Sequence, residues 1–229
     1  MRQTIPAIPA DPRQLGRAVN GFSLGNTLAA AQQIAGSPEQ YATLLRSAGM
    51  ERFVAHPPPP TPEIVATEAE FAGLFVQIYQ ALGERVMRTM MRNWGEALVP
   101  IILGSDLGQQ ALQQAADVPR EERRAWAVAQ AAEITNIFWA PVERTEDADA
   151  WHLTILRCPI CLQIRGAHEP LCMNAAAIYA GVLRALIGQR MQVREVACTA
   201  TGAEHCRYVV YKHLTAPAPL PPRAAGAGR

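Results

Sequence analysis

The clearest pattern of apolar and polar positions lies before residue 100, where apolar side chains recur at every third or fourth position. This spacing predicts a helix with one buried face, formed by Phe71, Leu74, Phe75, Ile78, Leu82, Val86 and Met90. Three arginines fall between these positions and are expected to face water or an acidic partner: Arg85, Arg88 and Arg92. A shorter helix is predicted to begin at Ser37, because serine is a good N-cap and Pro38 suits the first helical position. Further helices are expected over 106–116 and 119–139.

Beyond residue 140 the pattern changes to short alternating runs separated by polar turns. We expect four strands and one helix between the second and third of them, over 142–145, 151–157, 169–187 (the helix), 190–199 and 207–212. Residues 141–213 are therefore predicted to form an antiparallel sheet with β-β-α-β-β order. The complete chain is predicted to have an α+β fold, in which a helical part, residues 23–140, packs on this sheet as one unit.

Composition narrows the functional classes. The formal net charge of +1 gives no general attraction to nucleic acid. No apolar run reaches the roughly 18–20 residues that cross a bilayer, and prolines interrupt the segment where a secretory signal would lie. We therefore expect a cytoplasmic protein without a transmembrane segment, and its apolar helix surface is compatible with a homodimer. Proline, glycine and alanine are frequent in 1–22 and 214–229, which predicts a flexible lead-in and a disordered tail.

All five cysteines lie in the last third of the chain, at Cys158, Cys161, Cys172, Cys198 and Cys206. An odd number in a reducing compartment argues against a disulfide framework. Zinc or an iron–sulfur centre needs about four soft ligands, and the thiols together with His168 and His205 could supply them. Thiol chemistry is a second interpretation, and simple burial in a sheet domain is a third. Only one pair of the five has the two-residue spacing of a zinc knuckle.

Two local features add detail to this cysteine pattern. Cys172 lies in the first turn of the helix predicted over 169–187, where the helix dipole favours a thiolate. Cys172 is therefore the candidate catalytic thiol, with an expected decrease in pKa. Cys198 and Cys206 are equally spaced from Gly202. A hairpin centred on this glycine would bring the two sulfur atoms together.

The combined pattern resembles the 4-vinyl reductase domain family. The residues that carry this resemblance are Cys158-Pro159-x-Cys161, Cys172, Gly181-x-Leu183, Glu195-x-x-Cys198 and Gly202-Ala203-x-x-Cys206-x-Tyr208. Residues 44–50, the proline-rich spacer and the helix ending in Asn93-Trp94-Gly95 are similar to one branch of the family, the bacteriochlorophyll 4-vinyl reductases or J proteins of bacteriochlorophyll synthesis.

The resemblance implies a fold related to vesicle-tethering subunits and haem-type nitric oxide sensors, often with an apolar cavity. It also implies a role where divinyl protochlorophyllide or chlorophyllide is converted to its monovinyl form, with other bacteriochlorophyll-synthesis enzymes as partners. The sequence has no G-x-G-x-x-G after a strand, so no nicotinamide motif is visible. Three functions stay open: a tetrapyrrole carrier, the reductase itself, and a regulatory or assembly module that binds a small ligand.

A magnesium tetrapyrrole would need an axial ligand for its metal and a cation for its carboxylate. Histidine could supply the ligand, with His152, His168 and His205 as candidates. The arginines of the long helix, above all Arg88, could bind the carboxylate. The alternative interpretation of each residue is an ordinary histidine or a solvated helix face.

Overall fold

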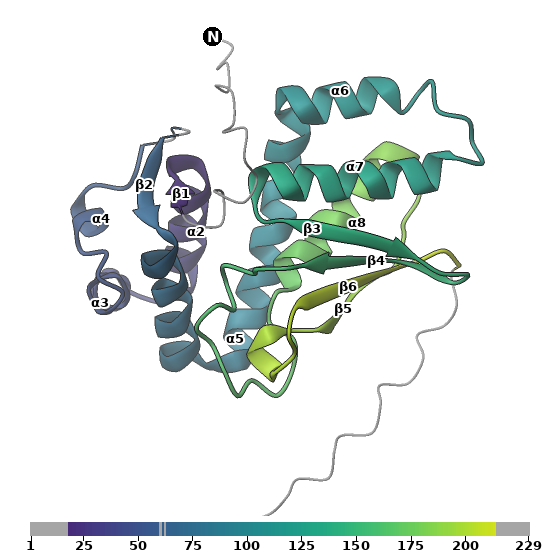
Figure 1. Ribbon diagram of the computed structural model, residues 1–229. Helices are drawn as coiled ribbons and strands as arrows, with labels where there is room; N and C mark the ends of the chain where they lie inside the picture. The colour runs from purple at the N-terminus through teal and green to yellow at the C-terminus, as the bar shows by residue number, and fades with distance from the viewer. Residues whose placement is uncertain (1–17, 60, 62, 214–229) are drawn as a thin grey trace, which may run out of the picture.

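The chain folds around one long helix, α5, which comprises Glu68–Gly104 and runs through the middle of the molecule (Figure 1). The computed structural model describes residues 18–59, 61 and 63–213. The predicted tail and most of the predicted lead-in lie outside these residues. In Figure 1, the helices that precede α5 and a small sheet lie on one side of it, and the larger sheet lies on the other.

The segment before α5 forms three helices and a two-stranded antiparallel sheet. These elements are β1 (Ala18–Asn20), α2 (Gly21–Ile34), α3 (Pro38–Ser47), α4 (Arg52–Ala55) and β2 (Ile64–Thr67). The Ser37 side chain accepts a hydrogen bond from the Gln40 N–H, so α3 begins at the predicted N-cap. Strand β2, in contrast, lies in a region for which the sequence predicts helices. Its β-branched residues favour extended backbone, but four residues are too few to show alternation.

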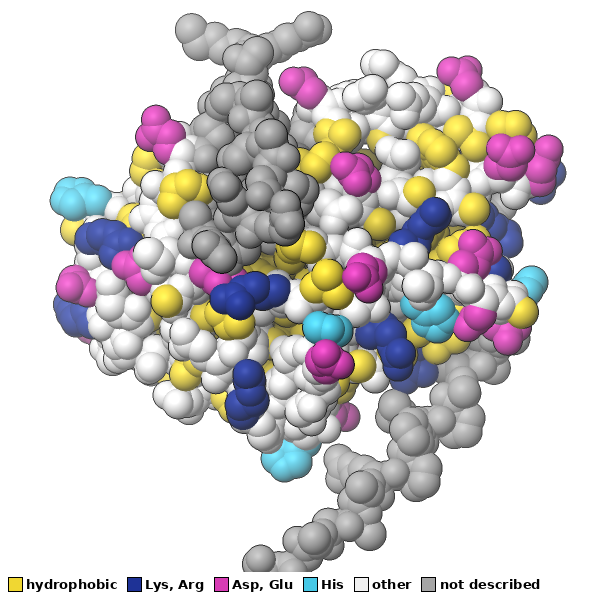
Figure 2. All heavy atoms as spheres, viewed as in Figure 1, with side chains coloured by type: hydrophobic (Ala, Val, Ile, Leu, Met, Phe, Trp, Pro, Cys, Tyr) yellow, Lys and Arg dark blue, Asp and Glu magenta, His cyan; other side chains and the backbone are white. Residues whose placement is uncertain are grey.

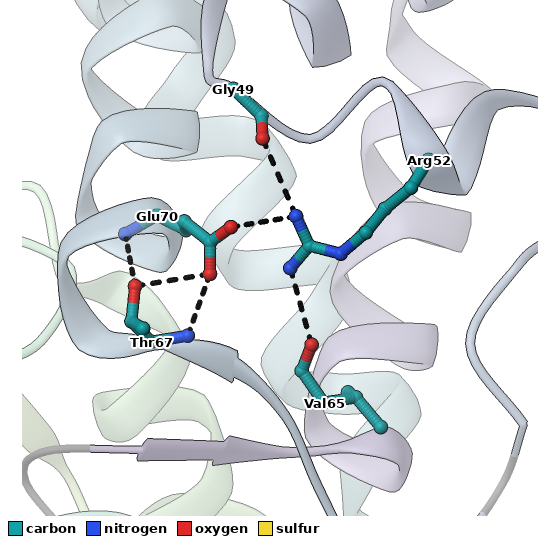
Figure 3. Close-up of polar contacts among 5 residues, drawn as sticks. All are labelled: Gly49, Arg52, Val65, Thr67 and Glu70. Atoms are coloured by element: carbon teal, nitrogen blue, oxygen red, sulfur yellow. Dashed lines mark hydrogen bonds and ion pairs between the residues drawn. The ribbon is translucent and has the colours of Figure 1, made fainter.

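The first turn of α5 is held by a polar network (Figure 3). Thr67 and Glu70 form a capping box, in which the Thr67 hydroxyl accepts from the Glu70 N–H and the Glu70 carboxylate accepts from the Thr67 N–H. Arg52 donates to the same carboxylate at 2.6 Å and to the Val65 carbonyl at 3.2 Å. The Arg52 hydrogen bond lowers the pKa of Glu70. The network therefore fixes α4 against β2 and α5.

Helix α5 has a sharp kink at Gly83, where φ is +78° and ψ is 169°. Before the kink, the predicted apolar face is buried at Phe71, Leu74, Phe75 and Ile78. After it, the buried face is formed by Met87, Met90, Met91 and Trp94, while Val86 is 38% exposed. The predicted apolar face is therefore wrong at Val86. A residue with positive φ interrupts the helical repeat, and glycine is the residue that accepts this conformation without steric cost.

The larger sheet is antiparallel, with strand order β3-β4-β6-β5. Its strands and the three remaining helices are α6 (Asp106–Gln114), α7 (Arg123–Phe138), β3 (Val142–Glu146), β4 (Ala150–Ile155), α8 (Met173–Ile187), β5 (Val193–Ala197) and β6 (Cys206–Tyr211). Helix α8 packs on α5 and α7, and Tyr208 of β6 is fully buried against Tyr179 of α8. The prediction of mixed helix and antiparallel sheet is confirmed. No described helix is long and apolar enough to cross a membrane.

The turn between β3 and β4 is held by the Asp147 carboxylate. It accepts from the N–H groups of Asp149 and Ala150 and contacts His152 Nε2 at 2.7 Å. The His152 hydrogen bond and these two backbone donors lower the pKa of Asp147 to about 2. Because the pKa is lower in the folded state than in the unfolded chain, the turn is stabilised above about pH 4 and loses this contribution as pH falls through about 2.

We therefore expect the Asp147 carboxyl carbon to titrate with a midpoint near 2 when its NMR chemical shift is followed against pH. A midpoint close to the ordinary aspartate value of about 3.9 would contradict the hydrogen bonding of this turn.

Candidate metal centre and ligand groove

The five cysteines meet in one buried cluster, which we call the thiol cluster. Cys158 and Cys161 lie in the loop after β4, Cys172 precedes α8, Cys198 follows β5, and Cys206 begins β6. Each cysteine is at most 3% exposed, and all five are free thiols. Segments from three different loops thus place their sulfur atoms together at one end of the sheet.

The sulfur atoms lie at distances that suit a shared metal ion. Cys172 Sγ is 2.8 Å from Cys161 Sγ and 3.3 Å from Cys158 Sγ. Cys198 Sγ is 3.9 Å from Cys206 Sγ and 3.4 Å from Cys161 Sγ. Two sulfur ligands of a tetrahedral zinc ion lie about 3.8 Å apart, given a Zn–S bond of about 2.3 Å. The expected proximity of Cys198 and Cys206 across Gly202, whose φ is +95°, is present in the structure.

Glu195 of β5 completes a second group of donors. Its carboxylate lies within 4.8 Å of the sulfur atoms of Cys172, Cys198 and Cys206. Both carboxylate oxygens are buried and have no hydrogen-bond partner among the described residues. An unpartnered buried carboxylate is costly, and a bound cation would remove that cost. The donor set of thiols and one carboxylate therefore fits a zinc-type cation.

Glu195 did not emerge as a ligand from the sequence, for a geometric reason. Residues three apart on a regular strand face opposite sides of the sheet, so Glu195 and Cys198 would be separated. The pairing of β5 with β6 shifts register between Glu195 and Ala197. Such an irregularity changes the alternation of side chains and lets both donors reach the same cluster.

The environment of the cluster divides the groups into two kinds. Burial raises the pKa of Cys172 and that of Glu195. Hydrogen bonds from the thiols of Cys161 and Cys172 lower the pKa of Cys198 to about 7. Cys158 raises the pKa of Cys206, but other thiols of the cluster outweigh it and lower that pKa to about 5.

The expected lowered pKa of Cys172 is therefore wrong. Cys172 is the N-cap of α8, which begins at Met173 and not at residue 169. The side chain is 1% exposed, so desolvation outweighs any effect of the helix dipole. A catalytic role for Cys172 stays a prediction, and a nucleophilic thiol would have to be exposed and ionised.

The histidines predicted as further metal ligands lie elsewhere. His205 Nδ1 contacts the Leu156 carbonyl at 3.0 Å, and His168 contacts Glu84 at 3.3 Å. Neither belongs to a group of donors close enough to share an ion among the described residues. The structure therefore assembles the metal candidates from cysteine and glutamate.

His168 lies instead in a groove of about 500 Å³, which we call the arginine groove. It is lined by Glu84, Arg85, Arg88, Thr89, Arg92, His168 and Glu169. The second half of α5 contributes five of these residues and the loop before α8 contributes two. Two candidate ligand-binding residues, Arg88 and His168, are thus in one place, whereas His205 and His152 are outside it.

The loop before α8 is fastened to α5 through Glu84. Its carboxylate accepts from the backbone N–H groups of His168, at 3.1 Å, and Glu169, at 2.7 Å. The same carboxylate contacts His168 Nδ1 at 3.3 Å, and Arg88 forms an ion pair with Glu169. The kink at Gly83 immediately precedes Glu84 and so determines where this fastening occurs. Elsewhere, on the face drawn in Figure 2, basic and acidic side chains are interspersed.

The fold and the thiol cluster define an α+β protein with a candidate metal centre between its strand ends. The family model of the 4-vinyl reductase domain matches residues 151–212, the segment that contains all five cysteines. This match supports a relationship to that domain family, whereas the bacteriochlorophyll branch stays a prediction. A similar solved structure is the phenol-responsive sensory domain of the transcription activator PoxR with phenol, with 18% identity, a TM-score of 0.40, and coverage of 66% of this chain and 78% of that chain. No curated protein matches the chain.

Proposed function

We propose that the chain is a tetrapyrrole-binding accessory protein of bacteriochlorophyll synthesis. In this proposal it binds divinyl protochlorophyllide or chlorophyllide and delivers it for reduction of the 8-vinyl group. The match of the 4-vinyl reductase domain over residues 151–212 supports the family. The observation that carries the proposal is the arginine groove, because it combines cationic side chains with an exposed histidine.

The groove offers chemistry for both polar features of such a pigment. Three arginines face two glutamates there, so a cation remains for a carboxylate. The planar guanidinium groups can also stack on a flat ring. A volume of about 500 Å³ lies in the usual range for small-molecule sites.

His168 is suited to bind the magnesium of the pigment. Its side chain is 90% exposed, and its Nδ1 atom contacts Glu84. A carboxylate on one ring nitrogen orients the imidazole and leaves the other nitrogen, Nε2, available for a metal. His205 has its Nδ1 atom against the Leu156 carbonyl and lies outside the groove, so His168 is the preferred axial ligand.

The alternative of a thiol-based reductase has less support. A reducing thiol must reach its substrate as a thiolate, but the cysteines are buried and burial raises the pKa of Cys172. The reductase also requires an electron donor. We therefore favour binding without turnover.

A titration with divinyl chlorophyllide, followed by absorbance with and without NADPH, tests the proposal. We expect a saturable spectral shift and no monovinyl product. Donor-dependent product would identify the reductase, and an unchanged spectrum would overturn pigment binding in favour of the regulatory module.

Arg88→Ala should weaken pigment binding by about tenfold or more, because a charge-assisted hydrogen bond contributes about 1.5–3 kcal/mol. His168→Ala should abolish the spectral change that accompanies axial ligation. Arg46→Ala and His56→Ala are the matched controls, since both side chains are exposed and lie outside the groove. Equal effects in variants and controls would place the pigment elsewhere.

A further inference from the structure

The thiol cluster contains two groups of four donors that overlap. One group comprises Cys158, Cys161, Cys172 and Cys206, and the other comprises Cys172, Glu195, Cys198 and Cys206. Within each group, all ligand atoms lie within 4.8 Å of one another. Each group alone has the number of ligands that a tetrahedral zinc-type ion takes, and the two groups share Cys172 and Cys206.

We propose that the cluster is a dinuclear thiolate centre for two zinc-type divalent cations, bridged by Cys172 and Cys206. Cys158 and Cys161 complete the coordination of one ion, and Glu195 and Cys198 complete that of the other. A thiolate sulfur has several lone pairs and can bind two ions. Six donors would leave two separate four-coordinate ions short of ligands, but two shared sulfur atoms give each ion four.

The charge of the site favours a second cation. With all donors ionised, five thiolates and one carboxylate carry six negative charges in a buried space. One divalent cation would leave four of these charges unbalanced, and two cations leave two. Because unpaired buried charge is strongly unfavourable, a single ion would require several donors to stay protonated. The unpartnered Glu195 carboxylate lies in the group opposite to the Cys158 and Cys161 pair.

Groups around the cluster also support both ligand sets. Arg165 donates to the Cys161 carbonyl at 3.1 Å and to the Ile164 carbonyl at 2.7 Å, which holds the loop of the Cys158 and Cys161 pair. The Thr199 N–H donates to Cys206 Sγ at 3.5 Å. Hydrogen bonds of this kind orient ligands and stabilise thiolates around a metal. A role restricted to burial would leave Glu195 unexplained.

Metal stoichiometry tests the proposal without any assay of activity. Protein purified without chelator should contain about two zinc ions per chain by elemental analysis. Metal-free protein titrated with Co²⁺ under anaerobic conditions should develop sulfur-to-cobalt charge-transfer absorption up to about two equivalents. The EPR signal should decrease as the second equivalent binds, because bridging thiolates couple the two spins.

Paired variants separate the two positions. The double variant Cys158→Ser and Cys161→Ser should bind about one equivalent without spin coupling, and so should the double variant Glu195→Gln and Cys198→Ser. Circular dichroism establishes that each variant is folded. The wild-type measurement decides independently if a variant fails to fold: one equivalent, or two equivalents without spin coupling, would overturn the bridged centre.

Discussion

Removal of metal from the thiol cluster is expected to lower the free energy of unfolding by roughly 5 kcal/mol or more. Structural zinc sites in small peptides contribute about 10–16 kcal/mol at neutral pH, whereas a complete domain has a stability of about 5–15 kcal/mol. The cluster joins the loop after β4, the start of α8 and the β5–β6 connection. These segments are far apart in the sequence, so loss of the ion releases all of them.

Cys172→Ala should have nearly the same effect as chelation, because Cys172 belongs to both groups of donors. The comparison is made by urea unfolding of the wild type and the variant, each with zinc and after metal removal. In zinc, we expect the variant to be several kcal/mol less stable. Without metal, the difference should shrink to the packing cost of one small buried group, about 1 kcal/mol.

This design separates a ligand from a residue that is merely buried. If Cys172 only fills space, the variant will be destabilised equally with and without zinc. If the metal-free wild type is unfolded, a zinc titration followed by circular dichroism replaces urea unfolding. The wild type should then fold on addition of zinc and Cys172→Ala should not.

The features that the sequence predicts well are those encoded by neighbouring residues. The N-cap at Ser37 and the apolar face from Phe71 to Ile78 depend on local spacing, and both occur in the structure. The proximity of Cys198 and Cys206 depends on the turn at Gly202. Each feature follows from a pattern within about ten residues.

The features that the sequence did not predict depend on long-range contacts. Gly83 stands in an apolar pattern that continues on both sides, and nothing local shows that the helix bends there. The register shift near Glu195 arises from pairing with β6, a separate strand beyond the Gly202 turn. The arginine groove depends on the kink and on the docking of the His168 loop by Glu84. Tertiary packing therefore decided the composition of both candidate sites.

Helices α5 and α8 approach each other closely at Gly95 of α5, and Gly95→Ala is expected to be strongly destabilising. A Cβ atom at this position would lie 2.7 Å from Asn174 Cα and 2.9 Å from Ala177 Cβ, and it would also meet the Asn174 carbonyl oxygen. Two of these atoms belong to the backbone of α8, which cannot move aside as a flexible side chain can. Overpacking of this kind costs about 1–3 kcal/mol and occasionally more.

The matched control is Gly73→Ala in the same helix. A Cβ atom there would meet only the Ala48 carbonyl oxygen at 3.8 Å, an ordinary contact. Because alanine is a better helix former than glycine, we expect this control to gain up to about 1 kcal/mol. Gly95→Ala has the same propensity gain but should still lose about 2 kcal/mol or more, which lowers the melting temperature by roughly 4–8 °C in a domain of this size.

The clash at Gly95 also reaches the thiol cluster. Asn174 lies in the first turn of α8, two residues after Cys172, and the Cys172 carbonyl accepts a hydrogen bond from the Tyr208 hydroxyl. A shift of α8 away from α5 would therefore move a shared donor relative to those of β5 and β6. We expect Gly95→Ala to weaken zinc binding as well as stability, measured by competition with a chromophoric chelator, whereas Gly73→Ala should leave zinc affinity unchanged. Equal melting temperatures and zinc affinities for the two variants would show that α5 and α8 are not packed as closely as this crossing requires.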